Sequence, residues 1–151
     1  MAETRPILVV KVGTSTLLDG VVVRQSAFDM IARNVVEMAD SYRIVLVTSG
    51  ATGFGMRLLA SVDRPSSLHQ LQALSMFGQV GLLEAWKAAF GEVPIGQVLL
   101  TRRELTEAST VEQLSHSLAS VWQYGGVPIV NENDAISSEE FGFSDNDQLA
   151  A

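Results

Sequence analysis

Four short apolar runs constrain the fold of this chain more than any other feature, because polar residues hardly interrupt them. They span residues 6–12, 43–48, 94–101 and 127–131. A strand with one face in water alternates apolar and polar side chains, whereas a strand that is covered on both faces is apolar throughout. The runs therefore predict a sheet that is buried on both faces, which favours parallel strands with helices packed on either side.

Helical patterns separate these runs. Apolar residues recur at helical spacing after Ser26, again after Ser67, and a third time between Leu114 and Trp122. Capping-box pairs predict four helix starts, because a hydroxyl group and a polar side chain three residues later satisfy free amide groups there. The pairs are Ser26 with Asp29, Ser67 with Gln70, Thr101 with Glu104, and Ser109 with Glu112. Alternation of strands and helices predicts an α/β fold, a doubly wound, mainly parallel sheet with helices on both faces.

Length and composition fit a single domain of 151 residues, of which 47% are hydrophobic. No apolar run approaches the roughly 18 residues of a membrane helix, so we expect no membrane partner and a cytoplasmic location. The absence of cysteine excludes a disulfide scaffold and a thiolate zinc site, and the two isolated histidines argue against a histidine metal cluster. A net charge of −7 argues against binding a nucleic-acid backbone.

Candidate binding residues follow two of the runs, because ligands of open parallel sheets bind beyond the carboxyl ends of the strands. The first run leads into Gly13, Thr14 and Ser15, and the second leads into Ser49 and Gly50. Glycine turns let an anion approach backbone amides, and hydroxyl groups add hydrogen-bond donors. The turns therefore predict contacts with a phosphate or a carboxylate, and ordinary strand-to-helix connections remain the alternative.

Charged and amide side chains extend this pattern. Lys11 lies near the end of an apolar strand, where an unpaired ammonium group is costly, so we expect an anionic partner unless its stem reaches solvent. Residues 131–134 (NEND) and 145–147 (DND) supply oxygens and amides that suit an amino group, a magnesium nucleotide or the fixing of catalytic lysines. Asx turns and helix caps are the alternative for these two clusters, and a solvated acidic loop is the alternative for the wider concentration of acids. The last twenty residues contain six of the seventeen acids, namely Glu132, Asp134, Glu139, Glu140, Asp145 and Asp147.

These motifs together resemble those of the glutamate 5-kinases, of the amino-acid kinase superfamily. Six segments carry the resemblance, in register from about residue 6 onward: 9–15 (VVKVGTS), 47–51 (VTSGA), 78–82 (GQVGL), 96–101 (GQVLLT), 127–135 (VPIVNENDA) and 145–151 (DNDQLAA). The resemblance implies transfer of the γ-phosphoryl group of ATP to the side-chain carboxylate of L-glutamate, the first step of proline biosynthesis. It also implies Mg²⁺ bound with the nucleotide, and a homo-oligomer.

The resemblance further implies roles for individual residues. It makes Lys11 and Asp147 catalytic, with Lys11 on the phosphates and Asp147 ordering the catalytic lysines. It makes Ser49, Asp134 and Asn146 the residues that bind glutamate. Phosphate and ATP binding is assigned to Lys11 together with Gly13, Thr14, Ser15 and Gly50. No residue is implied as a metal ligand.

The chain departs from the family pattern in two ways. Residues 110–114 (TVEQL) stand where relatives carry an Asn-Ala-Arg-like stretch. The nucleotide-loop segments of relatives, and the C-terminal RNA-modification-type domain of some of them, are not among the 151 residues. We therefore expect an N-terminal, glutamate-binding part of a kinase domain with little or no activity alone. A non-catalytic glutamate-binding or assembly module, and another acyl or phosphate kinase of the superfamily, remain open.

Overall fold

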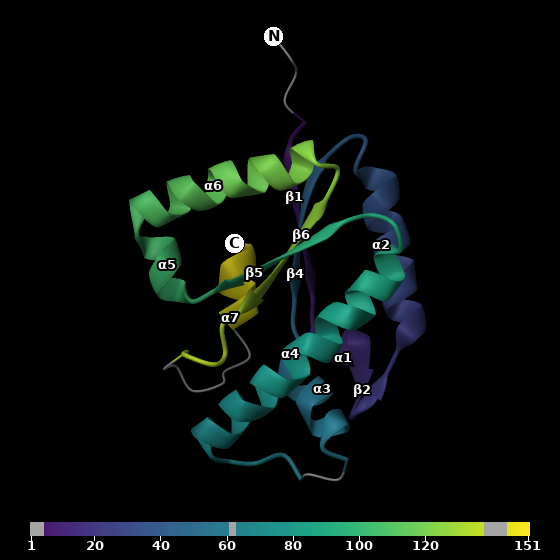
Figure 1. Cartoon of the computed structure of the whole chain (residues 1–151), viewed down its shortest axis with the longest axis vertical. Helices are drawn as coiled ribbons and strands as arrows, with labels where there is room; N and C mark the ends of the chain where they lie inside the picture. Colours follow the sequence, from purple (N-terminus) through teal and green to yellow (C-terminus); the bar gives the residue numbers. More distant parts are fainter. Residues whose placement is uncertain (1–4, 61–62, 138–144) are drawn as a thin grey trace.

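The computed structural model describes residues 5–60, 63–137 and 145–151, and a parallel sheet lies at its centre (Figure 1). The strands lie side by side in the order β1 (Ile7–Val12), β4 (Arg43–Thr48), β6 (Val127–Glu132) and β5 (Ile95–Leu100). Every neighbouring pair is parallel. Each strand matches one of the four apolar runs to within one residue at either end, so the prediction of a parallel α/β sheet is confirmed.

Three helices cover one face of the sheet. Alternate residues of a strand point to opposite faces, and Ile44 and Leu46 point to this one. They form the larger apolar core with α2 (Gln25–Met38), α3 (Ala51–Leu58) and α4 (Leu68–Phe90). A series of contacting aromatic rings from these helices lies in this core: Phe54, Phe28, Trp86 and Phe90.

The opposite face is covered by α6 (Ala108–Gln123) and α7 (Asp145–Ala150). Val45, Val47 and Val130 point to this side and form a smaller apolar cluster with side chains of both helices. The expected arrangement with helices on both faces is therefore confirmed. It explains why residues 44–47 of β4 and 127–130 of β6 are all apolar, since neither face of the two central strands meets water there.

Three short elements between β1 and α2 were not predicted from the sequence. Helix α1 (Thr14–Leu17) is a single turn, and β2 (Leu18–Asp19) pairs antiparallel with β3 (Val22–Val23). The connecting Gly20 has a φ of 59°, a conformation that favours glycine. Elements of two to four residues carry no periodic pattern, so the sequence offered no signal for them.

The predicted helix starts are confirmed only in part. Helix α4 begins after Ser67, although no side-chain hydrogen bond caps it, and it continues as one helix through both of its internal glycines (Figure 1). The other two serine caps are wrong. Helix α2 begins at Gln25, ahead of Ser26, because the preceding hairpin delivers the chain directly into the helix. Helix α6 begins at Ala108, ahead of Ser109.

The capping box at the start of α5 (Arg102–Thr106) is confirmed. Glu104 accepts a hydrogen bond from the hydroxyl group of Thr101 and another from the backbone N–H of Thr101, at 2.6 Å. Both bonds favour the ionised carboxylate. They lower the pKa of Glu104 below its ordinary value of 4.5, and the bond from the Thr101 hydroxyl has the largest effect.

We expect Glu104→Gln to remove a pH dependence from the free energy of unfolding. Because the pKa of Glu104 is lower in the folded chain than in the unfolded chain, its stabilising effect is complete above about pH 4.5 and is lost as the pH falls through the folded pKa. Urea unfolding should therefore show a stability difference between parent and variant near neutral pH that narrows in acid. A difference that stays constant with pH would contradict the capping role.

Glycines allow α3 and α4 to pack backbone against backbone. A Cβ atom at Gly78 would lie 1.7 Å from the carbonyl oxygen of Ala51, and one at Gly55 would lie 2.0 Å from the carbonyl oxygen of Leu74. No side chain is compatible with either distance, so close approach is what requires glycine here. The contact holds the first residue of α3 against α4, directly beyond the carboxyl end of β4.

Candidate functional site

Two side-chain pairs join the carboxyl ends of β1 and β4 to helix α7. Lys11 of β1 forms an ion pair with Asp147, with 2.7 Å between Nζ and Oδ1. Beside it, Asn146 donates a hydrogen bond from Nδ2 to the hydroxyl oxygen of Ser49, at 2.8 Å. Ser49 and Asn146 are 97 residues apart in the sequence, so only the folded chain brings them together.

The register of the sheet explains how Lys11 reaches Asp147. Lys11 lies beside Val47, whose side chain belongs to the smaller apolar cluster, so Lys11 points to the face that α7 covers. Asp147 is therefore the anionic partner that the position of Lys11 called for. The Lys11 side chain is 36% exposed and that of Asp147 is 56% exposed, so both charges stay within reach of a ligand. An ion pair this exposed contributes at most about 1 kcal/mol to folding.

Hydrogen bonds at both ends of the Asn146 amide hold it in one orientation. Its Oδ1 accepts the backbone N–H of Glu132 at 3.2 Å, while its Nδ2 donates to Ser49. The backbone N–H of Ser49 donates to the carbonyl oxygen of Val12 at 3.1 Å, which ties the residue to the end of β1. Because the Ser49 oxygen accepts the bond from Asn146, the hydroxyl proton can be donated to a ligand.

Two glycine turns border these pairs. A Cβ atom at Gly13 would lie 3.7 Å from the Lys11 Nζ, so bare backbone faces the ammonium group there. Thr14 and Ser15 follow in α1 and are exposed. Gly50 precedes the first residue of α3 with a φ of 114°, which glycine adopts without strain. Hydroxyl groups and bare backbone beside a cation suit an anionic ligand such as a phosphate.

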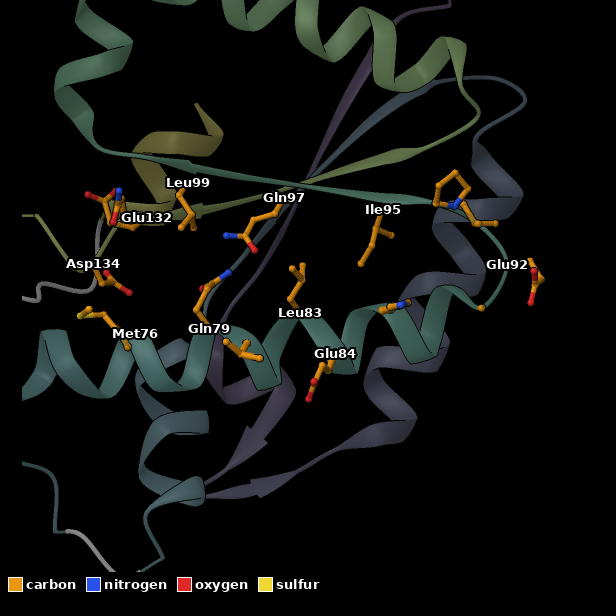
Figure 2. Close-up of a pocket in the computed structure, with 18 residues that line it drawn as sticks. Met76, Gln79, Leu83, Glu84, Glu92, Ile95, Gln97, Leu99, Glu132 and Asp134 are labelled. Atoms are coloured by element: carbon orange, nitrogen blue, oxygen red, sulfur yellow. The ribbon is translucent and has the colours of Figure 1, made fainter.

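Asp134 lies two residues beyond β6, where it lines a cavity of about 900 Å³ between α4 and β5. Figure 2 shows Asp134 and Glu132 at one end of this cavity and Glu92 at the other. The structure thus joins Lys11, Ser49, Asn146 and Asp147 through their contacts and places Asp134 in the wall of the adjoining cavity. Glu132 links the two regions, because its backbone N–H binds Asn146 and its side chain lines the cavity.

Asn131 and Gln79 have no individual role in the sequence motifs, but hydrogen bonds connect both of them to the two pairs. Asn131 is only 2% exposed, and its Nδ2 donates to the Gln79 Oε1 at 2.9 Å. Its Oδ1 accepts the backbone N–H of Glu132, also at 2.9 Å. The sequence does contain one signal for Asn131, which is an amide side chain at the end of an apolar strand. A buried amide requires hydrogen-bond partners, so such a residue is expected to be connected to others.

A buried hydrogen bond anchors the residue before Ser49. The indole N–H of Trp86 donates to the hydroxyl oxygen of Thr48 at 3.0 Å, and both side chains are fully buried. Trp86 lies on α4, so this bond ties the carboxyl end of β4 to the helix that covers it. In the sequence, Trp86 is one of several large apolar residues at helical spacing. This pattern predicts burial of the ring but does not indicate a partner for its N–H.

Thr48→Val should lower the free energy of unfolding by about 1–3 kcal/mol, because the variant keeps the shape of the side chain but leaves the buried Trp86 N–H without an acceptor. Thr48→Ser is the matched control, since it keeps the hydroxyl group and loses one methyl group. Urea unfolding should place Thr48→Ser closer to the parent than Thr48→Val. The reverse order would show that packing of the methyl group matters more than the hydrogen bond.

Other predicted features lie outside these contacts. Glu139 and Glu140 lie outside the described residues. Within residues 5–60, 63–137 and 145–151, no group of three histidine or acidic side chains is arranged to hold a metal ion. No helix in the same ranges is long and apolar enough to cross a membrane.

Comparison with known proteins identifies the family. The sequence profile of the amino acid kinase family matches residues 6–151. The chain is 40% identical to a glutamate 5-kinase from Thermus thermophilus over 147 residues, which cover 95% of this chain and 40% of that protein. It is 38% identical to glutamate 5-kinases from an Azoarcus species and a Synechococcus species, covering 95% and 100% of this chain.

The matches cover most of this chain but not of its relatives. The chain spans about 40% of the length of these glutamate 5-kinases. The family profile covers almost every residue, and it includes all of the strands and both side-chain pairs described above. The resemblance stated from the motifs is therefore confirmed, and this chain belongs to the amino acid kinase family.

Proposed function

We propose that this chain is the glutamate-binding part of a glutamate 5-kinase, which transfers the γ-phosphoryl group of ATP to the side-chain carboxylate of L-glutamate in the first step of proline biosynthesis. The meeting of the Lys11–Asp147 and Ser49–Asn146 pairs at one end of the sheet carries this proposal. The names of the relatives support glutamate as the acceptor, rather than the substrate of another kinase of the family.

In this proposal Ser49, Asn146 and Asp134 bind L-glutamate. The hydroxyl proton of Ser49 suits a carboxylate oxygen, because the Ser49 oxygen is already engaged by Asn146. The carboxylate of Asp134, in the wall of the adjoining cavity, suits the α-ammonium group. L-Glutamate carries carboxylates and an ammonium group, so its site needs a hydrogen-bond donor and an anion. Ser49 supplies the donor and Asp134 supplies the anion, and Glu132 connects the two.

Lys11 and Asp147 serve the phosphoryl transfer. An oxygen of the glutamate side-chain carboxylate attacks the γ-phosphorus, and the new O–P bond forms as the bond to the β,γ-bridging oxygen breaks and ADP leaves. The attacking carboxylate is already ionised, so the step needs alignment and charge neutralisation rather than a base. The Lys11 ammonium group, beside the bare backbone of Gly13, stabilises the transferring group, and Asp147 holds the ammonium group in place.

The nucleotide side of the proposal involves Gly13, Thr14, Ser15 and Gly50, whose turns suit phosphate oxygens. Mg²⁺ accompanies ATP and neutralises phosphate charge when bound. Mg²⁺ commonly keeps several waters and binds substrate phosphates. We extend the proposal to a homo-oligomer in the cytoplasm, and light scattering measures the oligomeric state.

Calorimetry tests glutamate binding directly. We expect L-glutamate to bind more tightly than L-aspartate or N-acetylglutamate. Ser49→Ala and Asn146→Ala should each weaken the binding about tenfold, the effect of one lost hydrogen bond. Ser41→Ala is the matched control, because Ser41 is an exposed serine in the turn before β4. Absence of glutamate binding by the parent chain would refute the proposal.

A coupled assay of ADP release tests the kinase assignment. We expect little or no glutamate-dependent ATP turnover from this chain alone, because the nucleotide-loop segments implied by the family resemblance are not among its 151 residues. Turnover near that of the Thermus thermophilus relative would contradict this expectation. Preferential binding of N-acetylglutamate or aspartate would favour a different kinase of the family.

A further inference from the structure

A continuous series of hydrogen bonds connects α4 to the Ser49–Asn146 pair. Gln79 of α4 accepts from Asn131 at 2.9 Å, and Asn131 accepts the backbone N–H of Glu132 at 2.9 Å. The same N–H lies 3.2 Å from the Asn146 Oδ1, and Asn146 donates to Ser49 at 2.8 Å. Side chains of α4, β6, α7 and the turn after β4, with one backbone N–H, are therefore connected by consecutive hydrogen bonds.

The series begins at a buried amide whose orientation depends on Gln79. Asn131 is 2% exposed, so water cannot readily replace its partners. Because the Gln79 Oε1 accepts from the Asn131 Nδ2, the Asn131 oxygen must face the backbone N–H of Glu132. Without the Gln79 acceptor, the buried Nδ2 would lose its partner, and the Asn131 amide would rotate toward another acceptor.

The middle of the series is a shared donor. The backbone N–H of Glu132 faces two acceptors, Asn131 Oδ1 and Asn146 Oδ1, which compete for one proton. A rotation of the Asn131 amide changes how strongly this N–H binds Asn146. Because the other end of the Asn146 amide donates to Ser49, such a change reaches the Ser49 hydroxyl group.

We propose that Gln79 is a positioning residue that orients the Ser49–Asn146 pair through Asn131. Figure 2 shows the Gln79 side chain extending from α4 toward the sheet, and its bond to Asn131 joins α4 to β6. The assignment rests on the proposed function, in which Ser49 and Asn146 bind glutamate. Gln79 therefore acts on glutamate binding through the bonds that set the geometry of the pair.

Three variants test this role. Gln79→Met removes the acceptor and keeps the length of the side chain, whereas Gln79→Glu keeps an acceptor oxygen. Gln97→Met makes the same chemical change on β5, on the opposite wall of the same cavity. We expect Gln79→Met to raise the Kd for L-glutamate about tenfold, because the Ser49–Asn146 pair leaves the orientation in which it binds the ligand, at a cost similar to that of one hydrogen bond. Gln79→Glu should bind more tightly than Gln79→Met, and Gln97→Met should bind like the parent.

An NMR measurement on the ligand-free chain separates failure of this proposal from failure of the proposed function. The side-chain NH₂ resonances of Asn146 should move in Gln79→Met and stay in place in Gln97→Met. This result does not require glutamate to bind. Parent-like Asn146 resonances in Gln79→Met would overturn the positioning role, and so would parent-like affinity of this variant if the parent chain binds glutamate. Lack of binding by the parent chain would count against the proposed function alone.

Discussion

Gly78→Ala should lower the free energy of unfolding by about 3 kcal/mol or more, at the upper end of the usual cost of overpacking a core. Its Cβ atom would lie 1.7 Å from the carbonyl oxygen of Ala51 and 2.3 Å from the backbone nitrogen of Gly55. Both atoms belong to the backbone of α3, which cannot rotate away as the end of a side chain can. Helix α3 would have to shift as a whole, and urea unfolding would record the loss.

Gly81→Ala is the matched control for this variant, because Gly81 lies on the same helix. Its Cβ atom would lie 3.1 Å from the side chain of Phe54, a far milder contact than the backbone clash at Gly78, and alanine favours the helix by about 1 kcal/mol. We expect unfolding close to that of the parent. The shift of α3 in Gly78→Ala should also weaken the proposed glutamate binding, because α3 begins directly after the turn at Ser49. Equal unfolding midpoints for the two variants would contradict the close packing.

Lys11→Met should lower the kcat of phosphoryl transfer about a thousandfold, as the loss of a group that stabilises developing charge does. The assay needs a protein of the length of the relatives, obtained by joining this chain to the part of the Thermus thermophilus glutamate 5-kinase outside the matched region. The KM for glutamate should change much less than kcat, because in the proposed function the ammonium group acts on the transferring phosphoryl group.

Lys87→Met is the matched control for Lys11→Met, since Lys87 is an exposed lysine on α4 and lines the cavity away from both pairs. Its kcat should equal that of the parent. Asp147→Asn should fall between the two, because the Lys11 ammonium group remains but loses its ion pair. A kcat of Lys11→Met near that of the parent would remove Lys11 from the catalytic step.

The strands could be predicted because their signal is local. The middle of a strand that is buried on both faces must be apolar, and this requirement is visible in a run such as residues 44–47 without knowledge of its neighbours. The capping box of Thr101 and Glu104 was likewise local, since its two members are three residues apart. The caps expected at Ser26 and Ser109 were wrong, because the segments before these helices set where the helices begin.

The candidate site was predicted as a set of residues, and the family resemblance implied only one of its contacts, that of Asp147 with a catalytic lysine. The rule that ligands bind at the carboxyl ends of parallel strands indicated Ser49, and the cost of an unpaired ammonium group indicated an anion near Lys11. These two rules do not pair Lys11 with Asp147 or Ser49 with Asn146. Those pairs depend on how α7 crosses the ends of β1 and β4.

The sequence alone determined the α/β class, the four strands and the end of the sheet at which polar groups gather, because hydrophobic runs and strand-end residues are properties of short segments. Only the tertiary structure decided which polar groups meet. Gln79 and Asn131 are 52 residues apart, and Ser49 and Asn146 are 97 residues apart, so their bonds depend on strand order and register. The need for glycine at position 78 has the same origin, since only the packing of α3 on α4 creates the close contact.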